Sequence, residues 1–331
     1  MSLAEAKKIV YLFGAGATHA ELTNLEPDLN PEKRGLLIGK VSSRVIEIAR
    51  RSKTYLKDVE MVSGTAGSLN IELLISLIEN SKIHNWANKT SHLKELVEKD
   101  IKTILTASQT GRFYLHKTLF ELHKHKNTKT KEEVIGLISL NYDDVLDRAY
   151  KAMLGKDPNY CFSLEADAPS SKNIPLLKLH GSFNWGSQEI RGRTRTIEII
   201  PLGSSKSYLH APYGFIWNRA LDVLIRCDTL RVIGCSLSPN DVHLIDLLFK
   251  AHLERSGAFD IEIIDRDLAG KQIQENYGFF PKIKTLLELK EPLIPDRAPV
   301  NPFKTWLKYK GIAMLGEDHI EGTRYLKKVV S

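Results

Sequence analysis

The chain has 331 residues, of which 42% are hydrophobic and 26% are charged. This composition is that of a globular protein with a large core, and it excludes an intrinsically disordered chain. The net charge is +7 and the pI is about 9.1. The densest basic run, 123–131 (HKHKNTKTK), has no interleaved aromatic residues, which favours a solvated loop. A polyanion contact is the alternative, so direct nucleic-acid binding stays undecided.

The three cysteines, Cys161, Cys227 and Cys235, include no C-x-x-C pair. This spacing excludes a four-cysteine zinc ribbon and argues against a disulfide scaffold. The polar N-terminal segment 1–8 lacks the apolar core of a signal peptide. No apolar stretch approaches the roughly 20 residues that a membrane span needs. We therefore expect a soluble, cytoplasmic protein with no metal site and no membrane contact.

The first predicted strand is the apolar run 9–13 (IVYLF), followed by a glycine-containing turn and a helix around 18–22. The segment 28–40 follows Pro27 and contains Pro31 and several charges, so it predicts a loop. From about 37 to 125, three apolar stripes at helical spacing predict helices. We expect the first part of an α/β core over 1–30 and a helical insertion over 31–130.

Strands and helices then alternate. The pattern predicts strands over 134–140, 174–179, 197–200, 230–233 and 261–264, and helices over 144–154, 213–225 and 241–253. Wholly apolar strands that alternate with helices indicate a parallel sheet. The expected fold class is α/β: a Rossmann-like parallel sheet with helices on both faces, a large helical insertion and no zinc module. The core would continue over 131–290, and 291–331 would form a C-terminal segment that docks on the core or on a neighbour.

Ligands of such sheets bind beyond the carboxyl ends of the strands, where four polar clusters fall. The first is 14–18 (GAGAT). Glycines after a strand let the backbone approach a phosphate, and the following helix N-terminus favours anions. The usual dinucleotide fingerprint needs Gly or Ala where this chain has His19, which disfavours an ordinary dehydrogenase. A tight strand–helix turn without a ligand is the alternative.

The second cluster is 139–144 (SLNYDD), in which Asn141 ends a strand. Asn141 could cap the next helix, with Asp144 three residues on, or its amide could hold a water or a ribose hydroxyl. The third cluster is 178–185 (KLHGSFNW), in which His180 ends the next strand. A histidine there could accept a proton near neutral pH, or it could be a hydrogen-bonded structural residue.

The fourth cluster is 234–241 (GCSLSPND). A turn of small residues after a strand suits a phosphate, so Gly234 and Ser236 are ligand candidates. Ser238 and Asp241 fit the N-cap and N3 positions of the next helix. Asp265 ends the last predicted strand, where it could hold an adenosine ribose or form a surface turn.

The order of these clusters resembles the sirtuin superfamily, which carries a GAG turn, an Asn-Ile-Asp segment, a His-Gly pair and a Gly-Thr-Ser turn in sequence. The resemblance covers about 7–272 without the helical insertion. Deacylating sirtuins also have a four-cysteine zinc module and a Pro-Asp-Phe-Arg segment, which this chain lacks. The chain looks more like the zinc-less sirtuin-like NAD hydrolases of bacterial antiviral defence, as in Thoeris, the defence-associated sirtuins and HerA-paired systems. The segment 69–80 resembles their insertion helix.

This resemblance implies an NAD+ nucleosidase that cleaves the nicotinamide–ribose bond to give nicotinamide and ADP-ribose, with NAD as substrate and no metal. The implied catalytic residues are Asn141, which would orient water and ribose, and His180, which would accept a proton. Asp143 would hold the nicotinamide carboxamide. The implied contacts to the diphosphate and ribose are Gly14, Ala15, Gly16, Thr18, Gly234, Ser236 and Asp265.

The resemblance further implies depletion of NAD+ in antiphage defence. Activation would come from homo-oligomerisation or from a partner such as a HerA-type ATPase or another co-encoded defence protein. One alternative is a sensor of NAD or ADP-ribose, or an assembly subunit, without catalysis. Another is an NAD-dependent protein deacylase, which the missing zinc ligands disfavour. Hydrolysis and cyclisation share their first step, so the sequence leaves the product balance open.

Overall fold

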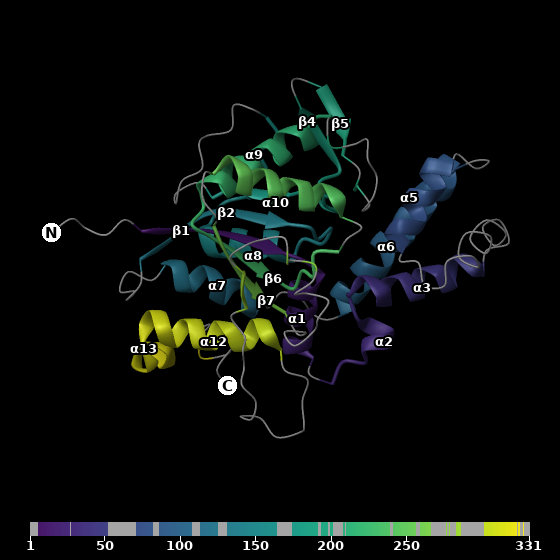
Figure 1. The fold of residues 1–331 in the computed structure, drawn as a ribbon. Coiled ribbons are helices and arrows are strands. Elements are labelled where there is room, and N and C mark those ends of the chain that lie inside the picture. Colours follow the sequence, from purple (N-terminus) through teal and green to yellow (C-terminus); the bar gives the residue numbers. More distant parts are fainter. Residues whose placement is uncertain are drawn as a thin grey trace.

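Figure 1 shows the fold in a computed structural model of the chain. The residues that the structure describes are 6–26, 28–51, 71–81, 86–107, 113–124, 131–163, 174–190, 193–197, 199–200, 208, 210–238, 241–255, 259–265, 276, 278, 283–285, 301–322, 324 and 327. None of the helices in these ranges combines the length and apolar composition that crossing a bilayer requires.

A six-stranded parallel sheet lies at the centre of the molecule, in the order β3-β2-β1-β6-β7-β8. The chain adds strands on one side of β1 as far as β3, then crosses back to build the other side from β6. The order reverses between β1 and β6, and ligands of open parallel sheets bind at such a switch point. The strands are β1 (Lys7–Phe13), β2 (Glu132–Ser139), β3 (Leu176–Lys178), β6 (Thr229–Ile233), β7 (Asp260–Ile264) and β8 (Ile283–Thr285).

Helices cover both faces of this sheet, which confirms the predicted α/β class (Figure 1). Val10 and Leu12 point to the face covered by α9 (Tyr213–Arg226) and α10 (Val242–Glu254). Ile9, Tyr11 and Phe13 point to the other face. Because both faces are buried, β1 is apolar at consecutive positions instead of alternating. The helices on the second face are α1 (Ala15–Leu25), α7 (Tyr114–Lys124), α8 (Val145–Leu154) and α12 (Pro302–Leu315).

The helices between α1 and α7 include three, over 38–50, 71–81 and 86–107, that form an apolar cluster of their own. They lie beside the carboxyl ends of the strands (Figure 1). The predicted loop over 28–40 is wrong in part, because α2 and the start of α3 fall within it. Asn30 accepts hydrogen bonds from Glu32 N and Lys33 N, and Pro31 is the first helical residue, so a helix start was taken for a loop. These helices are α2 (Pro31–Arg34), α3 (Ile38–Arg50), α5 (Ile71–Ser81) and α6 (Trp86–Ala107).

The strand predicted over 197–200 is also wrong. The neighbouring β4 (Ser187–Ile190) and β5 (Arg193–Thr196) pair antiparallel in a separate two-stranded sheet. Ile197 and Ile200 lie outside any strand but are buried in the core, which explains the strand-like pattern. Their amides donate to loop carbonyls, Ile197 N to Gly186 O at 2.9 Å and Ile200 N to His180 O at 2.8 Å. The segment is apolar because these side chains are buried in the core, although their backbone makes no strand pairing.

The described part of the C-terminal segment, 301–322, docks on the core, since Phe303, Trp306 and Leu307 of α12 are buried in the same cluster as β1. It continues into α13 (Glu317–Gly322). Asn301 caps α12 by accepting from Lys304 N at 3.0 Å, and its amide donates to Ala20 O in α1 at 2.6 Å. The domain limits at 30, 130 and 290 stay predictions.

A buried ionic network lies between α12 and the sheet. Arg231, 1% exposed in β6, donates to both carboxylate oxygens of Glu132 at 2.7 Å and to Glu262 at 2.5 Å. Lys310 of α12 reaches Glu132 at 2.7 Å. Two cations thus face two carboxylates, which compensates the desolvation of each charge. The network joins β2, β6 and β7 to the C-terminal helix.

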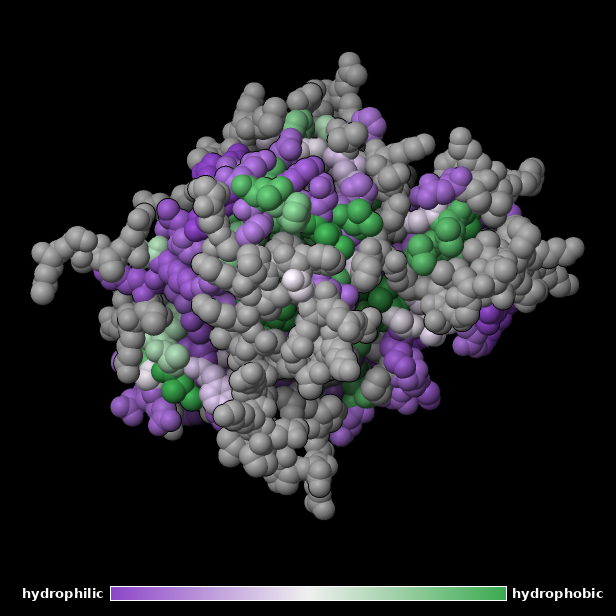
Figure 2. Space-filling view, in the orientation of Figure 1, coloured by the Kyte–Doolittle hydropathy of each residue, from purple (hydrophilic) through white to green (hydrophobic). Residues whose placement is uncertain are grey.

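The surface of α10 has an apolar stripe on the side that faces away from the sheet. Val242 is 63% exposed, Phe249 46% and Leu253 62%. Figure 2 shows apolar side chains gathered on this face of the molecule, above the sheet. Helix α10 is therefore apolar on its buried side and on part of its exposed side.

The turns after β1 and β6 approach so closely that only glycine fits. A Cβ atom on Gly14 would lie 2.4 Å from Gly234 O, and one on Gly16 would lie 2.6 Å from Gly234 Cα. Gly234 has a φ of +62°, and its Cβ would meet Ala17 N at 2.3 Å. Gly16 N also donates to Gly234 O at 2.9 Å. The glycines let α1 begin directly against the turn after β6.

We expect Gly234→Ala to lower the free energy of unfolding by at least about 2 kcal/mol, because it combines an unfavourable φ with a backbone clash. Gly39→Ala is the matched control, since nothing lies within 4 Å of a Cβ at this position in α3. It should stabilise the protein by up to about 1 kcal/mol through helix propensity. Urea unfolding of wild type and both variants measures their free energies of unfolding. Equal unfolding midpoints for Gly234→Ala and Gly39→Ala would contradict the close contact at Gly234.

Candidate functional site

Asn141 links the end of β2 to the turn after β1. Its side-chain amide donates to Gly14 O at 3.0 Å and to Thr18 Oγ1 at 2.9 Å. The capping interpretation of Asn141 is wrong, because α8 begins only at Val145 and its N-cap position is Asp144. Both amide hydrogens are used, so the amide oxygen is the group left to accept from a water or a hydroxyl. The two hydrogen bonds fix the orientation of the Asn141 amide, as the alternative interpretation, a ligand-binding role, would require.

Asp143 is held beside Asn141 by the same threonine. Thr18 Oγ1 donates to Asp143 Oδ2 at 3.0 Å, and Val145 N donates to Asp143 Oδ1 at 3.0 Å. Burial raises the pKa of Asp143 above its usual range, and the nearby Lys178 ammonium opposes this rise. Asn141, Thr18 and Asp143 therefore form one hydrogen-bonded chain at the carboxyl ends of β1 and β2.

Lys178 fixes the loop after β2 to the loop after β3. Its ammonium, at the end of β3, donates to Asp143 O, to Asp147 Oδ2 at 2.9 Å and to Ser182 Oγ at 2.6 Å. Ser182 Oγ in turn donates to Tyr142 O at 3.1 Å. Lys178 is fully buried and has three acceptors, as many as an ammonium can satisfy. Sequence reasoning missed this role because a lysine inside an apolar strand gave no sign of its partners.

His180 lies just past the end of β3, buried at 2% exposure among aromatic rings. Its ring centroid is 6.4 Å from Tyr142, 6.5 Å from Tyr208 and 6.4 Å from Trp217. Burial lowers the pKa of His180, so the imidazole is neutral and can accept a proton. Its Nε2 atom lies 3.6 Å from Asp241 Oδ2.

Glu72 comes to this site from α5, far away in the sequence. Tyr142 OH donates to Glu72 Oε1 at 2.7 Å and lies 3.2 Å from Ile200 O. Burial raises the pKa of Glu72 to about 7, an effect that the Tyr142 hydrogen bond opposes and the Asp241 charge adds to. In the sequence, the signal for this role was a glutamate between the apolar residues Ile71 and Leu73 of a predicted helix. The helical region therefore supplies an ionisable group to the strand-end loops.

The remaining predicted ligands lie around the switch point. Gly234 packs against the turn that holds Ala15, whereas Ser236 is exposed and its carbonyl accepts from Asn276 Nδ2 at 2.8 Å. Asp265 is half-buried and directly follows β7, whose Ile264 accepts from Gly234 N at 2.9 Å. The structure thus leaves the Ser236 side chain exposed to solvent. It brings the following predicted ligands into a continuous set of contacts: Gly14, Gly16, Thr18, Asn141, Asp143 and Gly234.

The predicted cap of α10 needs correction. Its N-cap is Asp241, whose Oδ1 accepts from Leu244 N at 3.2 Å, and not Ser238. The N-cap lies three residues later than expected because the turn after β6 continues through Leu237, a buried residue with a φ of +50°. Asp241 is thereby placed beside His180.

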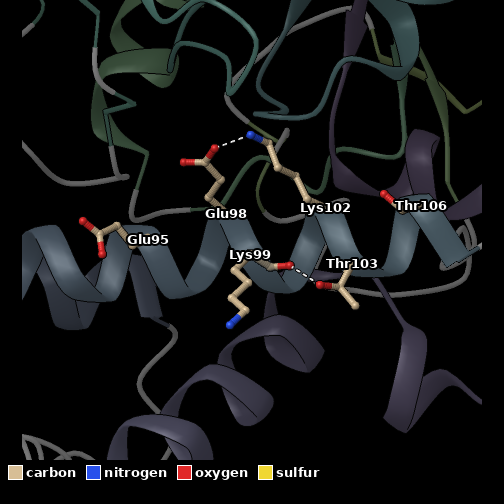
Figure 3. Close-up of a pocket in the computed structure, with 6 residues that line it drawn as sticks. All are labelled: Glu95, Glu98, Lys99, Lys102, Thr103 and Thr106. Atoms are coloured by element: carbon tan, nitrogen blue, oxygen red, sulfur yellow. Dashed lines mark hydrogen bonds and ion pairs between the residues drawn. The ribbon is translucent and has the colours of Figure 1, made fainter.

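A hollow on α6 is a separate feature (Figure 3). It is lined by side chains of that helix alone: Glu95, Glu98, Lys99, Lys102, Thr103 and Thr106. Lys102 pairs with Glu98, and Thr103 Oγ1 donates to Lys99 O at 2.7 Å. These groups satisfy one another within a single helix, so the strand-end loops are the stronger candidate. In the described ranges no group of three or more His, Cys, Asp or Glu side chains could hold a metal ion.

The pKa of Glu72 makes stability depend on pH. A carboxyl whose pKa is higher in the folded state binds more protons there, so the free energy of unfolding falls as pH rises from 4.5 to about 7. We expect wild type to lose about 3 kcal/mol more than Glu72→Gln over this range. Glu95→Gln, at an exposed position on α6, is the control and should behave like wild type. Parallel pH curves for wild type and Glu72→Gln would contradict the shifted pKa.

No protein-family model and no curated protein matches the chain. Among solved structures, a Sir2 protein bound to a propionylated peptide (Sir2Tm) is similar at 12% identity and a TM-score of 0.40, with 93% of each chain covered. A Sir2 homologue in complex with NAD has 16% identity and a TM-score of 0.38, with 80% of each chain covered. A Sir2–p53 peptide–NAD+ complex has 13% identity and a TM-score of 0.38, covering 85% of this chain and 88% of the other. Such low identities and TM-scores do not assign a family or an activity to this chain.

Proposed function

We propose that this chain is a sirtuin-like NAD+ hydrolase that cleaves the nicotinamide–ribose bond to give nicotinamide and ADP-ribose. The observation that carries the proposal is the position of Asn141. Its amide is clamped to the GAG turn at Gly14 and to Thr18, with its oxygen left to accept from a ligand. The four motifs whose order resembles sirtuins follow β1, β2, β3 and β6. They therefore lie at the carboxyl ends of the strands, the edge at which ligands of such sheets bind near the switch point.

The dinucleotide would lie across the turns after β1 and β6. The N-terminus of α1 at Ala15 would attract the diphosphate, because a helix N-terminus favours anions. The backbone amides of Gly14, Gly16 and Gly234 donate within the protein, so these glycines would line the site through their close packing. Ser236, Asp265 and Thr18 would contact the riboses. Asp143 would hold the carboxamide, although its two carboxylate oxygens already accept from Thr18 and Val145.

Cleavage of the glycosidic bond develops positive charge on the ribose and needs a positioned water more than covalent help. The Asn141 oxygen would orient this water and a ribose hydroxyl. His180, kept neutral by burial, would accept the proton that the water or hydroxyl gives up. The aromatic rings around His180 exclude bulk water from that step.

The biological role that we propose is NAD+ depletion in antiphage defence. Uncontrolled hydrolysis would be toxic to the cell, so we expect low activity of the isolated chain. Activation would come from assembly of several copies or from a co-encoded partner such as a HerA-type ATPase.

We expect Asn141→Ala and His180→Ala each to lower NAD+ turnover at least about 100-fold while the protein stays folded. Nicotinamide release is measured with purified protein, alone and with a co-encoded partner or lysate. Asn88→Ala on α6 and His210→Ala, both at exposed positions, are matched controls that should keep wild-type turnover.

Three outcomes would contradict this proposal. Wild-type rates in both site variants would remove Asn141 and His180 from the reaction. NAD bound without cleavage under every condition would indicate a sensor or an assembly subunit. Nicotinamide release that requires an acylated peptide would indicate a deacylase. Circular dichroism of each variant separates loss of chemistry from loss of fold.

A further inference from the structure

His180 and Asp241 form a buried pair that the residue pattern did not predict. His180 Nε2 and Asp241 Oδ2 are 3.6 Å apart, and their side chains are 2% and 4% exposed. Within the described part of the chain, Nε2 has no hydrogen-bond partner. A buried imidazole nitrogen that faces only a carboxylate is best satisfied when it carries the proton.

The carboxylate of Asp241 is held rigidly in this position. Its Oδ1 accepts from Leu244 N at 3.2 Å, and its backbone amide donates to Ser238 O at 2.9 Å. Leu237 has a φ of +50° and is 1% exposed, so burial maintains a left-handed backbone conformation that leucine rarely adopts. One carboxylate oxygen is used by the helix cap, and the other faces the imidazole.

The other ionisable groups around His180 do not offer this partner. His243 follows on α10 and, if protonated, would repel a charged His180. Burial raises the pKa of Tyr142 and of Tyr208, so both phenols stay neutral. Glu72 interacts with the phenol of Tyr142 and has a pKa of about 7. Asp241 is therefore the carboxylate whose charge lies against the imidazole ring.

We infer that Asp241 is a positioning residue for His180. It keeps the imidazole proton on Nε2, so that Nδ1 is the nitrogen that accepts a proton, and it stabilises the imidazolium that then forms. In the hydrolysis step, the water oxygen bonds to the anomeric carbon of the ribose, and the bond to nicotinamide breaks with its electron pair leaving on nicotinamide. Nδ1 takes the proton that the water gives up, directly or through a ribose hydroxyl, and Nε2 keeps its own proton. The catalytic part of this inference rests on the proposed function, whereas the pairing itself does not.

The substitution Asp241→Asn tests the pairing, because asparagine caps a helix as well as aspartate and so keeps the bond to Leu244 N. Asp246→Asn, on the exposed side of α10 and paired with Lys250, is the matched control. Nitrogen NMR of the imidazole rings reports which nitrogen carries the proton. The His180 signals are identified by their loss in His180→Ala.

In wild type near neutral pH we expect a protonated Nε2 and an unprotonated Nδ1. In Asp241→Asn this preference should weaken, and the pKa of His180 should fall by about one unit or more, whereas Asp246→Asn should match wild type. A proton on Nδ1 in wild type, or an unchanged ring spectrum in Asp241→Asn, would overturn the inference.

Turnover then separates the inference from the proposed function. We expect the kcat of Asp241→Asn to fall about tenfold, with little change in KM, because Asp241 would act on the chemical step through His180 and not on binding. If the ring spectra respond as expected but wild type does not cleave NAD+, the pairing stands and the proposed hydrolase fails. If turnover depends on His180 but the His180 ring spectrum is the same in wild type and Asp241→Asn, the proposed hydrolase stands and the inference fails.

Discussion

The contact between the turns after β1 and β6 is the constraint on which the rest of the site depends. Gly14 and Gly16 lie against Gly234 so closely that a single Cβ would meet backbone atoms at 2.3–2.6 Å. This contact fixes the start of α1 at the switch point of the sheet and presents Gly14 O and Thr18 to Asn141. The orientation of the Asn141 amide therefore follows from one backbone packing arrangement.

Buried polar side chains transmit this constraint along the strand ends. Lys178 holds the loop after β2 and the loop after β3 with one ammonium. In the network between α12 and the sheet, Arg231 joins three strands through Glu132 and Glu262, and Lys310 joins Glu132 to α12. Such pairs are costly to bury and costly to break, so they favour one arrangement of the loops over its alternatives.

The helical region supplies an ionisable side chain to the loops at the strand ends. Glu72 of α5 contacts Tyr142, whose ring lies beside His180, so a movement of α5 would change the surroundings of the candidate base. On the other side of His180, the turn after β6 delivers Asp241. The Asp241 charge raises the pKa of the imidazole against the effect of burial, whereas Glu72 is connected to His180 through the ring of Tyr142.

The sequence alone determined the parallel α/β core, because strands buried on both faces are apolar without alternation and the helices keep a 3.6-residue period. It also placed the four polar clusters at strand ends, since a glycine or polar residue must follow each buried run. It failed at 197–200, where two buried isoleucines have no ladder, and at Asn141 and Asp241, whose capping roles were assigned to the wrong positions. Only the tertiary structure decided that Asn141 bonds Gly14, that Lys178 joins two loops, that Glu72 bonds Tyr142, and that Asp241 approaches His180. These contacts join residues that are distant in the sequence, and neither local propensity nor apolar period carries information about such pairings.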